Sequence, residues 1–502
     1  MLLRSENAAL PENRWGVSFR EQCCGLAEHI AGLIHSAGRS PPHQILMYLQ
    51  SLRLQDFKSF RDASIDFRAP SDDPGDPTLF QNVTLLLGDN GSGKSSVLRA
   101  AAIALVGDLI STAGFVPTTL VRRGARPKPR FAALDAHVSL HWHDTGASKP
   151  DEGTQSAILH ARIDAFGVRE ELHVAPDKLN ARLLRAARSS EYSRLVFGYS
   201  ATRRVEAPES FDSASRRKRG TFYARIASLF EEQFSLTPLV SWLPRFEVQN
   251  PGRAKQVKAL LNTLLPDDCE FTGRLTEYDY GFRHRGVLLP FAALSDGYRG
   301  YVGWIADLLY HLAMSCPPGV KLTEGRSIVL VDEIDVHLHP SWQRDVLPLL
   351  ARALPRVQFL VTTHSPIVAG SLQPWNVLRI NRDEDGASVV VRPMSALHGL
   401  SSEQVLLSPY FDMETTRSTD AVLSLQARAL RAGDGDVVAA REFVEQLKGT
   451  LVPEMSMKSP RPADASTVGA TSGVKTAAVR KRMSAAVSAK LTAAAPGRRK
   501  RT

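Results

Sequence analysis

The chain has 502 residues, of which 43% are hydrophobic, 23% charged and 7% aromatic, a composition typical of a soluble globular protein with more than one lobe. A mean hydropathy of −0.16 and the lack of an uncharged apolar run of about 18 residues exclude a membrane-spanning helix. The first residues form no secretory apolar segment, and the four cysteines are too few and too scattered for a disulfide framework or a zinc site: Cys23, Cys24, Cys269 and Cys316. We therefore expect a cytoplasmic protein with no membrane partner.

The formal net charge of +10 is concentrated at the C-terminal end. Residues Val474–Thr502 carry nine Lys or Arg and no acid, and without them 53 basic residues face 52 acidic ones. This segment is rich in Ala, Ser and Thr and has no aromatic residue, which predicts disorder. Two interpretations stay open: the tail binds nucleic acid by neutralising phosphates, or it is a solvated tail without a ligand.

Residues 1–46 do not resemble the start of a domain, and we expect a disordered N-terminal extension with one short amphipathic helix within Gly25–Gly38. A strand pattern begins near Met47. Either Met47 is the true translation start or the extension belongs to the native protein.

From Met47 the pattern predicts strands and helices that alternate, which favours an α/β fold with a parallel sheet. Apolar alternation over residues 131–175 predicts an added antiparallel sheet, and residues 221–265 have helical periodicity. The predicted strands are Leu49–Phe57, Ala63–Phe67, Asn82–Leu87, Leu195–Ser200, Gly286–Pro290, Ser327–Val331 and Val357–Thr362. The predicted core helices are Lys94–Gly107, Ser295–Met314 and Ser341–Ala353. The predicted domains are lobe I (47–205), a helical insert (206–285), lobe II (286–395), a C-terminal helical region (396–450) and the tail (451–502).

The strongest motif is the octapeptide Gly88–Ser95 (GDNGSGKS), which fits the pattern G-x-x-x-x-G-K-[ST] and stands between an apolar strand and a helix. Its glycines let backbone N–H groups turn towards phosphate oxygens, and the helix N-terminus adds partial positive charge. Lys94 is placed to reach the β- and γ-phosphates of a nucleotide, and the Ser95 hydroxyl to ligate Mg²⁺.

A second motif, Ile328–Glu333 (IVLVDE), predicts a buried strand that delivers two carboxylates to the C-terminal edge of a sheet. Asp332 is placed to hold Mg²⁺, directly or through water. Glu333 is placed to orient or deprotonate an attacking water.

Two later segments, Leu294–Arg299 (LSDGYR) and Val361–Pro366 (VTTHSP), complete a set whose order and spacing resemble the ATP-binding-cassette (ABC) ATPases. The match is closer to the RecF/SMC-like branch, especially to bacterial AAA-type ATPases of the overcoming-lysogenisation-defect and Septu defence kinds. Four segments carry this resemblance: Ser51–Phe67, Gly88–Ser96, Leu294–Gly300 and Asp332–Gln343. The stretch from Gly399 to Ser418 looks like the C-terminal part of Septu-type ATPases, which are usually encoded beside an HNH nuclease.

The resemblance implies a P-loop ABC-type ATPase head with a mixed central sheet, an antiparallel β subdomain and a helical lobe. It implies ATP and Mg²⁺ as ligands, a homodimer formed head to tail on ATP binding, an HNH-type nuclease partner and DNA as a further partner. The implied catalytic residues are Glu333 and His364, and the implied metal ligands are Ser95 and Asp332. The implied nucleotide-binding residues are Gly88, Asn90, Gly91, Ser92, Gly93, Lys94, Ser95 and Ser96 of one subunit, with Ser295 and Gly297 of the other. In addition, Asp335 would connect the two sites, and Lys58 and Arg61 either face the adenine or α-phosphate edge or lie in a plain surface turn.

The sequence departs from the family pattern in three respects. The segment Leu294–Arg299 corresponds to the signature motif of these ATPases, and it carries Asp296 and Tyr298 where transporter cassettes have Gly and Gln. Between the predicted helix Lys94–Gly107 and Gln155 there is no glutamine that could serve as the Q-loop residue. The long insert between the glycine-rich motif and the signature motif has no coiled-coil heptads. The first two departures leave open a scaffold that hydrolyses ATP slowly and regulates a nuclease partner. The third argues against a long coiled-coil arm.

Two further interpretations concern histidines and basic residues, and two concern alternative functions. His337 and His339 are interpreted as part of the turn after Asp335 and of the next helix start, rather than as a metal site. The basic run Val121–Arg130, with Arg203, Arg204 and Arg216–Arg219, forms either a surface for DNA or a partner, or a set of solvated loops. A transporter subunit is disfavoured by the FKSF turn, the long insert and the signature, and no nuclease motif is found after His364.

Overall fold

The computed structural model describes residues 44–70, 80–111, 115–124, 128–143, 154–174, 195–205, 221–275, 279–316 and 319–448. The expected helix within 25–38, the basic cluster at 216–219 and the tail at 474–502 lie outside these residues. The chain divides into two compact units, the first ending at Thr416 and the second beginning at Arg417.

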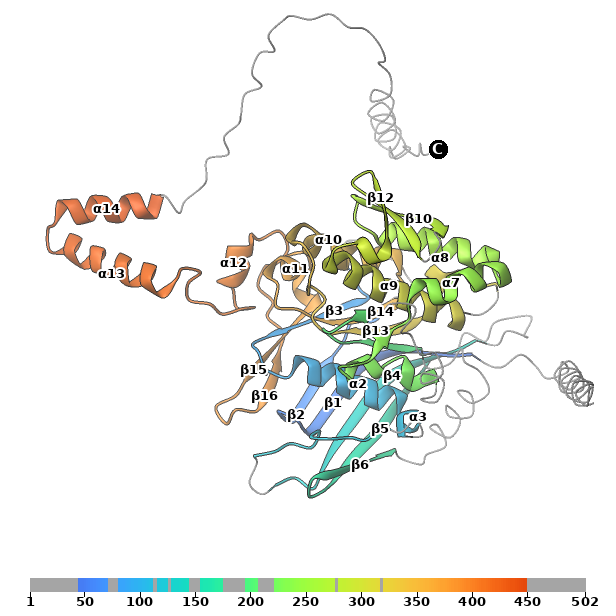
Figure 1. Ribbon diagram of the computed structural model, residues 1–502. Helices are drawn as coiled ribbons and strands as arrows, with labels where there is room; N and C mark the ends of the chain where they lie inside the picture. Colours follow the sequence, from blue (N-terminus) through green and yellow to red (C-terminus); the bar gives the residue numbers. More distant parts are fainter. Residues whose placement is uncertain are drawn as a thin grey trace, which may run out of the picture. The chain divides into compact units, whose positions relative to one another are not determined.

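A six-stranded sheet in the order β16-β15-β3-β14-β13-β7 forms the centre of the first unit (Figure 1). The strands from β15 to β7 are parallel and β16 is antiparallel, which confirms the predicted mixed sheet. Strands β13 and β14 are buried at every position because their residues are almost all apolar. The strand bounds are β3 Val83–Gly88, β7 Val196–Tyr199, β13 Ser327–Val331, β14 Val357–Thr362, β15 Val377–Arg382 and β16 Ser388–Val391.

A second sheet is wholly antiparallel, in the order β2-β1-β4-β5-β6, as predicted for the β subdomain. Its strands are β1 Gln44–Phe57, β2 Phe60–Asp66, β4 Phe131–His143, β5 Thr154–Phe166 and β6 Arg169–Val174. Strand β1 begins ahead of the predicted Leu49, because Gln44–Leu46 also pair with β4. The buried Gln358 of β14 joins the two sheets: its side chain accepts from Leu49 N at 2.8 Å and donates to Leu49 O at 2.7 Å.

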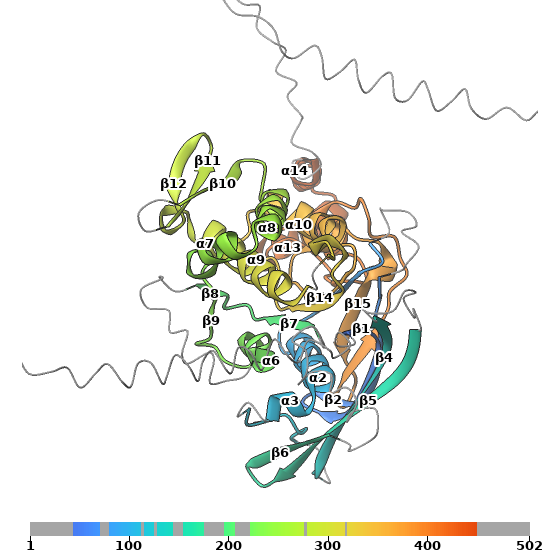
Figure 2. The ribbon, with the colours of Figure 1, turned by 90° about the vertical axis from the view of Figure 1, so that its right-hand side faces the viewer.

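Helix α2 (Lys94–Val106) lies between the two sheets and contacts strands of both (Figure 2). Four of its residues are alanines, Ala100, Ala101, Ala102 and Ala104, all buried. Small side chains let the helix approach both sheets closely, so its position, and that of the loop before it, is fixed by packing. The short helix α3 (Asp108–Ser111) follows α2 and contacts it, and α6 (Thr221–Ala224) packs against α3.

A helical lobe adjoins the central sheet. It consists of α7 (Leu239–Gln249), α8 (Pro251–Leu264), α9 (Asp296–Ser315) and α10 (Pro340–Ala353), with a small sheet of β10 (Cys269–Leu275), β11 (Tyr280–His284) and β12 (Val287–Pro290). Helix α9 is its most buried element and includes the fully buried Trp304. The remaining short elements of the first unit are β8 (Arg204–Val205), β9 (Ser235–Leu236), α11 (Pro366–Gly370) and α12 (Ser402–Leu406). The predicted fold class, with mixed sheet, antiparallel subdomain and helical lobe, is therefore confirmed.

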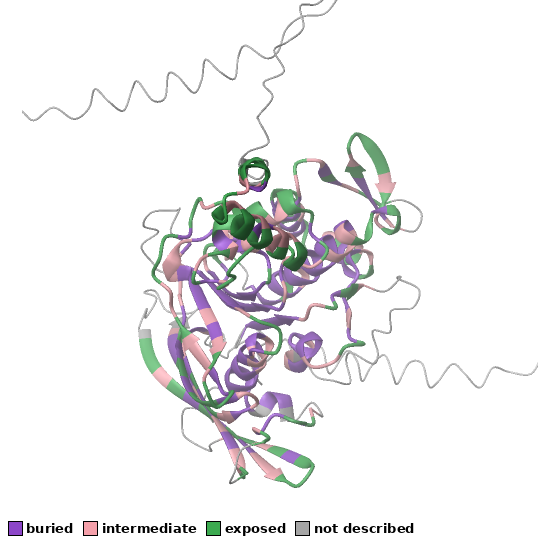
Figure 3. Cartoon of the chain, turned by 90° about the vertical axis from the view of Figure 1, so that its left-hand side faces the viewer, coloured by how far each residue is buried: buried purple, intermediate pink, exposed green. Residues whose placement is uncertain are grey.

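The second unit contains two helices, α13 (Thr419–Gly433) and α14 (Val437–Lys448), which pack against each other. Leu425 and Ala439 are buried and Arg428 pairs with Glu442 at 3.3 Å. Figure 3 shows that these helices are largely exposed, whereas buried residues fill the central sheet and α2. Within the described parts of the chain, no helix has the length and apolarity needed to cross a bilayer.

Two cysteines of the helical lobe are expected to resist alkylation. Burial raises the pKa of Cys269 to about 11, with a further contribution from Asp268, and burial also raises the pKa of Cys316. At pH 8 the thiolate fraction of Cys269 is therefore roughly a hundredfold below that of an ordinary cysteine. Peptide mapping after iodoacetamide treatment should show both thiols modified far more slowly in the native than in the urea-unfolded chain. Equal rates in the two states would contradict their burial.

Candidate nucleotide site

The loop Gly88–Gly93 joins β3 to α2 and has the backbone geometry of an anion cradle. Gly88, Gly91 and Gly93 have φ angles of 146°, 73° and 114°, which favour glycine. A Cβ on Gly93 would lie 2.8 Å from Ser59 Oγ, on the β1–β2 turn, and 2.8 Å from the ring of Phe60, the first residue of β2. Gly93 is also the N-cap of α2, so the free N–H groups of that helix begin at the loop.

Lys94 is the first residue of α2, and its ammonium lies inside the loop. It donates hydrogen bonds to Gly88 O at 2.8 Å and Asp89 O at 2.9 Å. Burial lowers the pKa of Lys94, and the negative charges of Asp332 and Glu333 oppose that shift. Lys94 is therefore electrostatically coupled to the carboxylate pair predicted from the sequence.

The topology explains this proximity. Strand β14 lies between β3 and β13 and pairs with both in parallel, so all three end at one edge of the sheet. Since neighbouring strands are about 4.8 Å apart, the ends of β3 and β13 are about 10 Å apart. The structure thus brings Lys94 together with Asp332 and Glu333, as the two motifs predict.

Thr362, the last residue of β14, fixes both members of the carboxylate pair. Its hydroxyl donates to Asp332 Oδ1 at 2.6 Å and accepts from the Glu333 backbone N–H at 2.8 Å. Asp332 is only 8% exposed, whereas Glu333 is partly exposed and has a positive φ of 47°. The two carboxylates therefore differ: Asp332 is held within the sheet edge, and Glu333 has access to solvent.

The other residues predicted for the loop are placed as follows. Ser95 and Ser96 lie in the first turn of α2 and are half-buried, and Asn90 is exposed. The Ser92 hydroxyl is buried and has no hydrogen-bond partner among the described residues. An unpaired buried hydroxyl and a glycine-lined backbone fit a ligand rich in hydrogen-bond acceptors, such as a polyphosphate. Half-buried Ser95 and buried Asp332 together provide oxygen donors of the type that Mg²⁺ prefers.

His364 lies just beyond β14 and its side chain is exposed. Its neighbours are fixed: Thr363 donates a hydrogen bond to Asp335, and Ser365 caps α11 by accepting from Ile367 N and Val368 N. The histidine is thus presented to solvent from a rigid turn at the same sheet edge as Glu333.

Ser295 and Gly297 come from the helical lobe, at the N-terminus of α9. The atoms nearest to Gly297 belong to His337 and not to the phosphate loop, and a Cβ there would lie 2.5 Å from His337 O. Ser295 occupies the N-cap position without a capping hydrogen bond from its side chain, which is exposed. Within one chain, therefore, the signature segment packs against the turn after Asp335.

Tyr298, one of the unusual signature residues, has a structural explanation. Its hydroxyl donates to Asp268 Oδ1 at 2.5 Å, and its ring lies edge-on to Trp342 with centroids 4.2 Å apart. It therefore anchors the start of α9 to Asp268, the residue before β10, and to α10. Asp296 is exposed and pairs with Arg299 on the same helix.

Lys58 and Arg61 have different surroundings. Lys58 lines a cavity of about 520 Å³ that also includes Asp332, and burial and the charge of Arg99 lower its pKa. Arg61 pairs with Asp385 at 2.7 Å in an exposed ion pair. Of the two, only Lys58 thus lines the cavity that contains Asp332.

Arg203 is a residue of this site that the sequence does not reveal. Its basic neighbours predict a surface for DNA or a partner, or a solvated loop, but its side chain is only 9% exposed and donates to the backbone carbonyls of Asp332 and Glu333. It follows β7, the strand paired with β13, in the segment Ser200–Arg203. Gln155 lies on β5 in the antiparallel sheet, away from the central sheet. The strand that pairs with β13 is β7, and the residue that follows β7 is Ser200 and not a glutamine.

The histidines after Asp335 do not form a metal site in the described part of the chain, where no group of three His, Cys, Asp or Glu could hold a metal ion. His339 is the N-cap of α10 and its ring contacts Ser341 Oγ at 2.8 Å. The interpretation of His339 as a helix start agrees with this geometry.

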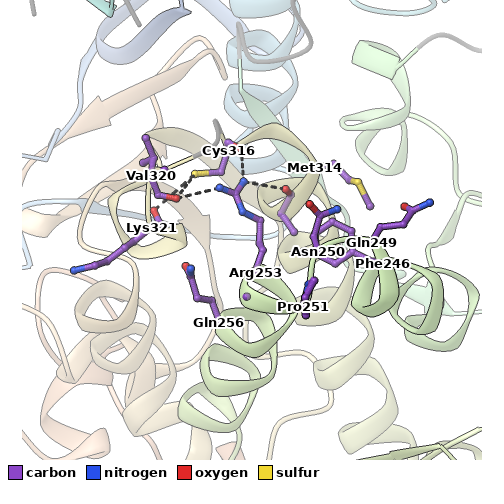
Figure 4. Close-up of a pocket in the computed structure, with 13 residues that line it drawn as sticks. Phe246, Gln249, Asn250, Pro251, Arg253, Gln256, Met314, Cys316, Val320 and Lys321 are labelled. Carbon is purple, nitrogen blue, oxygen red and sulfur yellow. Dashed lines mark hydrogen bonds between the residues drawn. The ribbon is translucent and has the colours of Figure 1, made fainter. Parts of the chain in front are cut away.

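A second cavity, of about 580 Å³, lies between the α7–α8 junction and the end of α9 (Figure 4). Arg253 reaches across it, donating to Cys316 O, to Ala313 O at 3.3 Å and to Val320 O at 3.1 Å. Arg253 thus donates hydrogen bonds to carbonyl groups at the C-terminal end of α9 that the helix itself leaves unpaired, which is a structural role.

Comparison with known proteins gives matches over both lobes. The family described as "AAA domain, putative AbiEii toxin, Type IV TA system" matches residues 162–369, and a further AAA-domain family matches residues 51–123. Septu protein PtuA of Bacillus mycoides is 25% identical over 371 residues, which cover 74% of this chain and 45% of that protein. The "Retron Ec83 probable ATPase" of Escherichia coli is 33% identical over 149 residues, which cover 30% of this chain and 28% of that protein.

Among solved structures, the SMC head domain from Thermotoga maritima covers 69% of this chain and 99% of that structure, at 20% identity and a TM-score of 0.37. The chain spans less than half the length of the two relatives described above. The matches confirm the resemblance predicted from the motifs.

Proposed function

This chain resembles the ABC/AAA-type ATPases of the Septu defence kind, and we propose that it binds ATP with Mg²⁺ and hydrolyses it to ADP and phosphate. One observation carries the proposal. A glycine-lined loop holding Lys94 and a carboxylate pair at Asp332 and Glu333 lie at one sheet edge and are electrostatically coupled.

Each residue has a distinct role in the proposed reaction. The loop N–H groups and the start of α2 bind the β- and γ-phosphates, and the Lys94 ammonium neutralises their charge. Ser95 and Asp332 would hold Mg²⁺, which supplies further charge neutralisation when bound. Glu333 orients the attacking water and accepts its proton, and its exposure gives it access to that water. His364, exposed at the end of β14, contacts the γ-phosphate.

We propose further that two copies associate head to tail on ATP binding. Ser295 supports this arrangement, because its hydroxyl is exposed and does not cap its own helix. The N-terminus of the 20-residue helix α9 is then free to face the γ-phosphate held by another copy. Asp335, bonded to Thr363 next to His364, would connect the two sites.

The relatives suggest the process that this ATPase serves. Their names place them in Septu and retron systems, so we propose a role in antiviral defence, with DNA repair as the alternative DNA-linked process. The proposed partners are an HNH-type nuclease and DNA, and ATP-driven association of two heads would control the nuclease.

A second candidate is a scaffold that hydrolyses ATP slowly and regulates the nuclease by binding alone. The segment after β7 favours it, since Ser200 follows where a Q-loop glutamine was expected. This candidate predicts nuclease association that needs ATP and persists when hydrolysis is blocked.

Phosphate release from the purified full chain decides between the candidates. The ATPase proposal predicts release that requires Mg²⁺ and is lost in EDTA, with and without double-stranded DNA. Release no greater than in EDTA, together with ATP-dependent binding of the nuclease, would favour the scaffold. Absence of both activities would contradict both candidates.

A further inference from the structure

Arg203 is a buried charge next to the carboxylate pair. It is 9% exposed, and its guanidinium lies 5.6 Å from the centre of the Trp304 ring of α9. Burying an arginine away from water costs free energy, so its retention at this position calls for specific partners.

Those partners are the two peptide groups that flank Glu333. Arg203 Nη2 donates to Asp332 O at 2.7 Å and to Glu333 O at 2.6 Å. Thr362 completes the enclosure: its hydroxyl accepts from Glu333 N at 2.8 Å, and its carbonyl accepts from Ile334 N at 2.9 Å. Four hydrogen bonds thus hold the backbone on both sides of Glu333.

Glu333 requires such restraint. Its φ of 47° lies in the left-handed region, which a non-glycine residue adopts only at an energetic cost. Without external bonds the turn would relax towards negative φ, and the Glu333 side chain would leave the sheet edge in another direction.

Joining β7 to β13 does not itself require Arg203. The two strands already pair from Ile328 to Val331, and Asp332 N donates to Tyr199 O at 2.8 Å. The bonds of Arg203 are made beyond the end of that ladder, to the turn itself. Arg203 also stays charged at neutral pH: burial lowers its pKa to about 10, while Asp335, Asp332 and Glu333 oppose the shift.

We infer that Arg203 is a positioning residue, which fixes the direction of the Glu333 carboxylate by binding the peptide groups on either side of it. The inference rests on the proposed hydrolysis for its consequence, although not for its geometry. The loop that carries Arg203 also lines the cavity containing Asp332, through Ser200 and Thr202. Arg203 therefore connects this cavity-lining loop to the backbone of Glu333.

Two substitutions test this role. Arg203→Lys keeps the charge but presents one ammonium, and Arg203→Met keeps most of the volume without any donor. Arg225→Lys is the matched control, because Arg225 is also buried, at 4% exposure, but donates to Ser315 Oγ and contacts the Phe197 ring, away from Glu333. Turnover, the Kd for a non-hydrolysable ATP analogue, and hydrogen exchange of the full chain are measured for each.

We expect both Arg203 variants to lose turnover by tenfold to about a hundredfold while the Kd of the analogue changes less than about threefold. The amides of Glu333 and Ile334 should exchange roughly tenfold faster in both variants and at the wild-type rate in Arg225→Lys. If the loss of any buried arginine loosened the fold in general, exchange at Glu333 and Ile334 would rise equally in Arg225→Lys.

The hydrogen-exchange measurement separates two kinds of failure. If the wild type does not hydrolyse ATP, the proposed function fails, and the exchange comparison still decides whether Arg203 holds the turn. Unchanged exchange at Glu333 and Ile334 in both Arg203 variants overturns the inference. Unchanged turnover in variants of an active wild type overturns its consequence for hydrolysis.

Discussion

Replacing Glu333 by Gln is expected to lower ATP turnover by between a hundredfold and about ten thousandfold while ATP binding persists. The reason is chemical: the amide is nearly the same size as the carboxylate but cannot accept the proton of the attacking water. The bonds that Arg203 donates to the carbonyls of Asp332 and Glu333, and the bond that Glu333 N donates to the Thr362 hydroxyl, do not involve the Glu333 side chain, so the turn should keep its shape. Phosphate release at saturating ATP measures turnover, and titration calorimetry with ATP measures binding.

Glu333→Gln also tests the proposed head-to-tail association. If ATP holds two copies together and hydrolysis separates them, this variant should accumulate as a dimer in Mg-ATP and remain a monomer in ADP, as measured by sedimentation velocity. The matched control is Glu384→Gln, an exposed carboxylate in the turn between β15 and β16. Turnover within about twofold of the wild type in Glu333→Gln would exclude Glu333 as the general base.

Motifs that carry their own local geometry could be predicted from the sequence. The strand–glycine–lysine–helix pattern gave α2 within one residue of its observed end, and the predicted bounds of β13 and β14 are those observed. Four apolar residues followed by two acids predict a buried strand that carries carboxylates to a sheet edge, and in combination with the phosphate-loop motif they predicted that Asp332 and Glu333 lie near Lys94.

Arg203 shows what the sequence could not give. Two adjacent arginines after a short apolar strand look like a basic surface, and nothing local indicates that the strand lies beside β13. Only the register of β7 against β13 places one of these arginines under the turn of Glu333. One signal was available: Arg203 follows a strand of fully buried residues by only four positions, which is short for reaching an open surface.

The role of Tyr298 also could not be predicted from the sequence, although here the sequence suggested a functional residue and the structure shows a packing residue. Its departure from the transporter-cassette pattern bears on the rate of hydrolysis and not on nucleotide binding, but its partners, Asp268 and Trp342, are 30 and 44 residues away in sequence. Tertiary packing determines its role, and the open hydroxyl of Ser295 is the feature of this segment that remains available to a ligand.

Replacing Lys94 by Ala is expected to weaken ATP binding by tenfold to about a hundredfold or more, with hydrolysis lost at the same time. The ammonium makes two hydrogen bonds inside the loop and is the cation nearest to its glycine backbone among the predicted site residues. A charge-assisted hydrogen bond contributes about 1.5–3 kcal/mol, which corresponds to this range of affinity. Titration calorimetry with a non-hydrolysable ATP analogue measures the loss.

The two substitutions should separate binding from chemistry, because Lys94 acts on the phosphates and Glu333 on the water. Lys94→Ala should therefore bind ATP weakly and remain monomeric at the Mg-ATP concentration that just saturates the wild type, whereas Glu333→Gln should bind and dimerise. Lys94→Arg is the control for charge alone: the site is 6% exposed at this residue, so the bulkier guanidinium should not restore affinity. Wild-type affinity in Lys94→Ala would contradict this role, since an ammonium bonded inside the loop is expected to contribute measurably to phosphate binding.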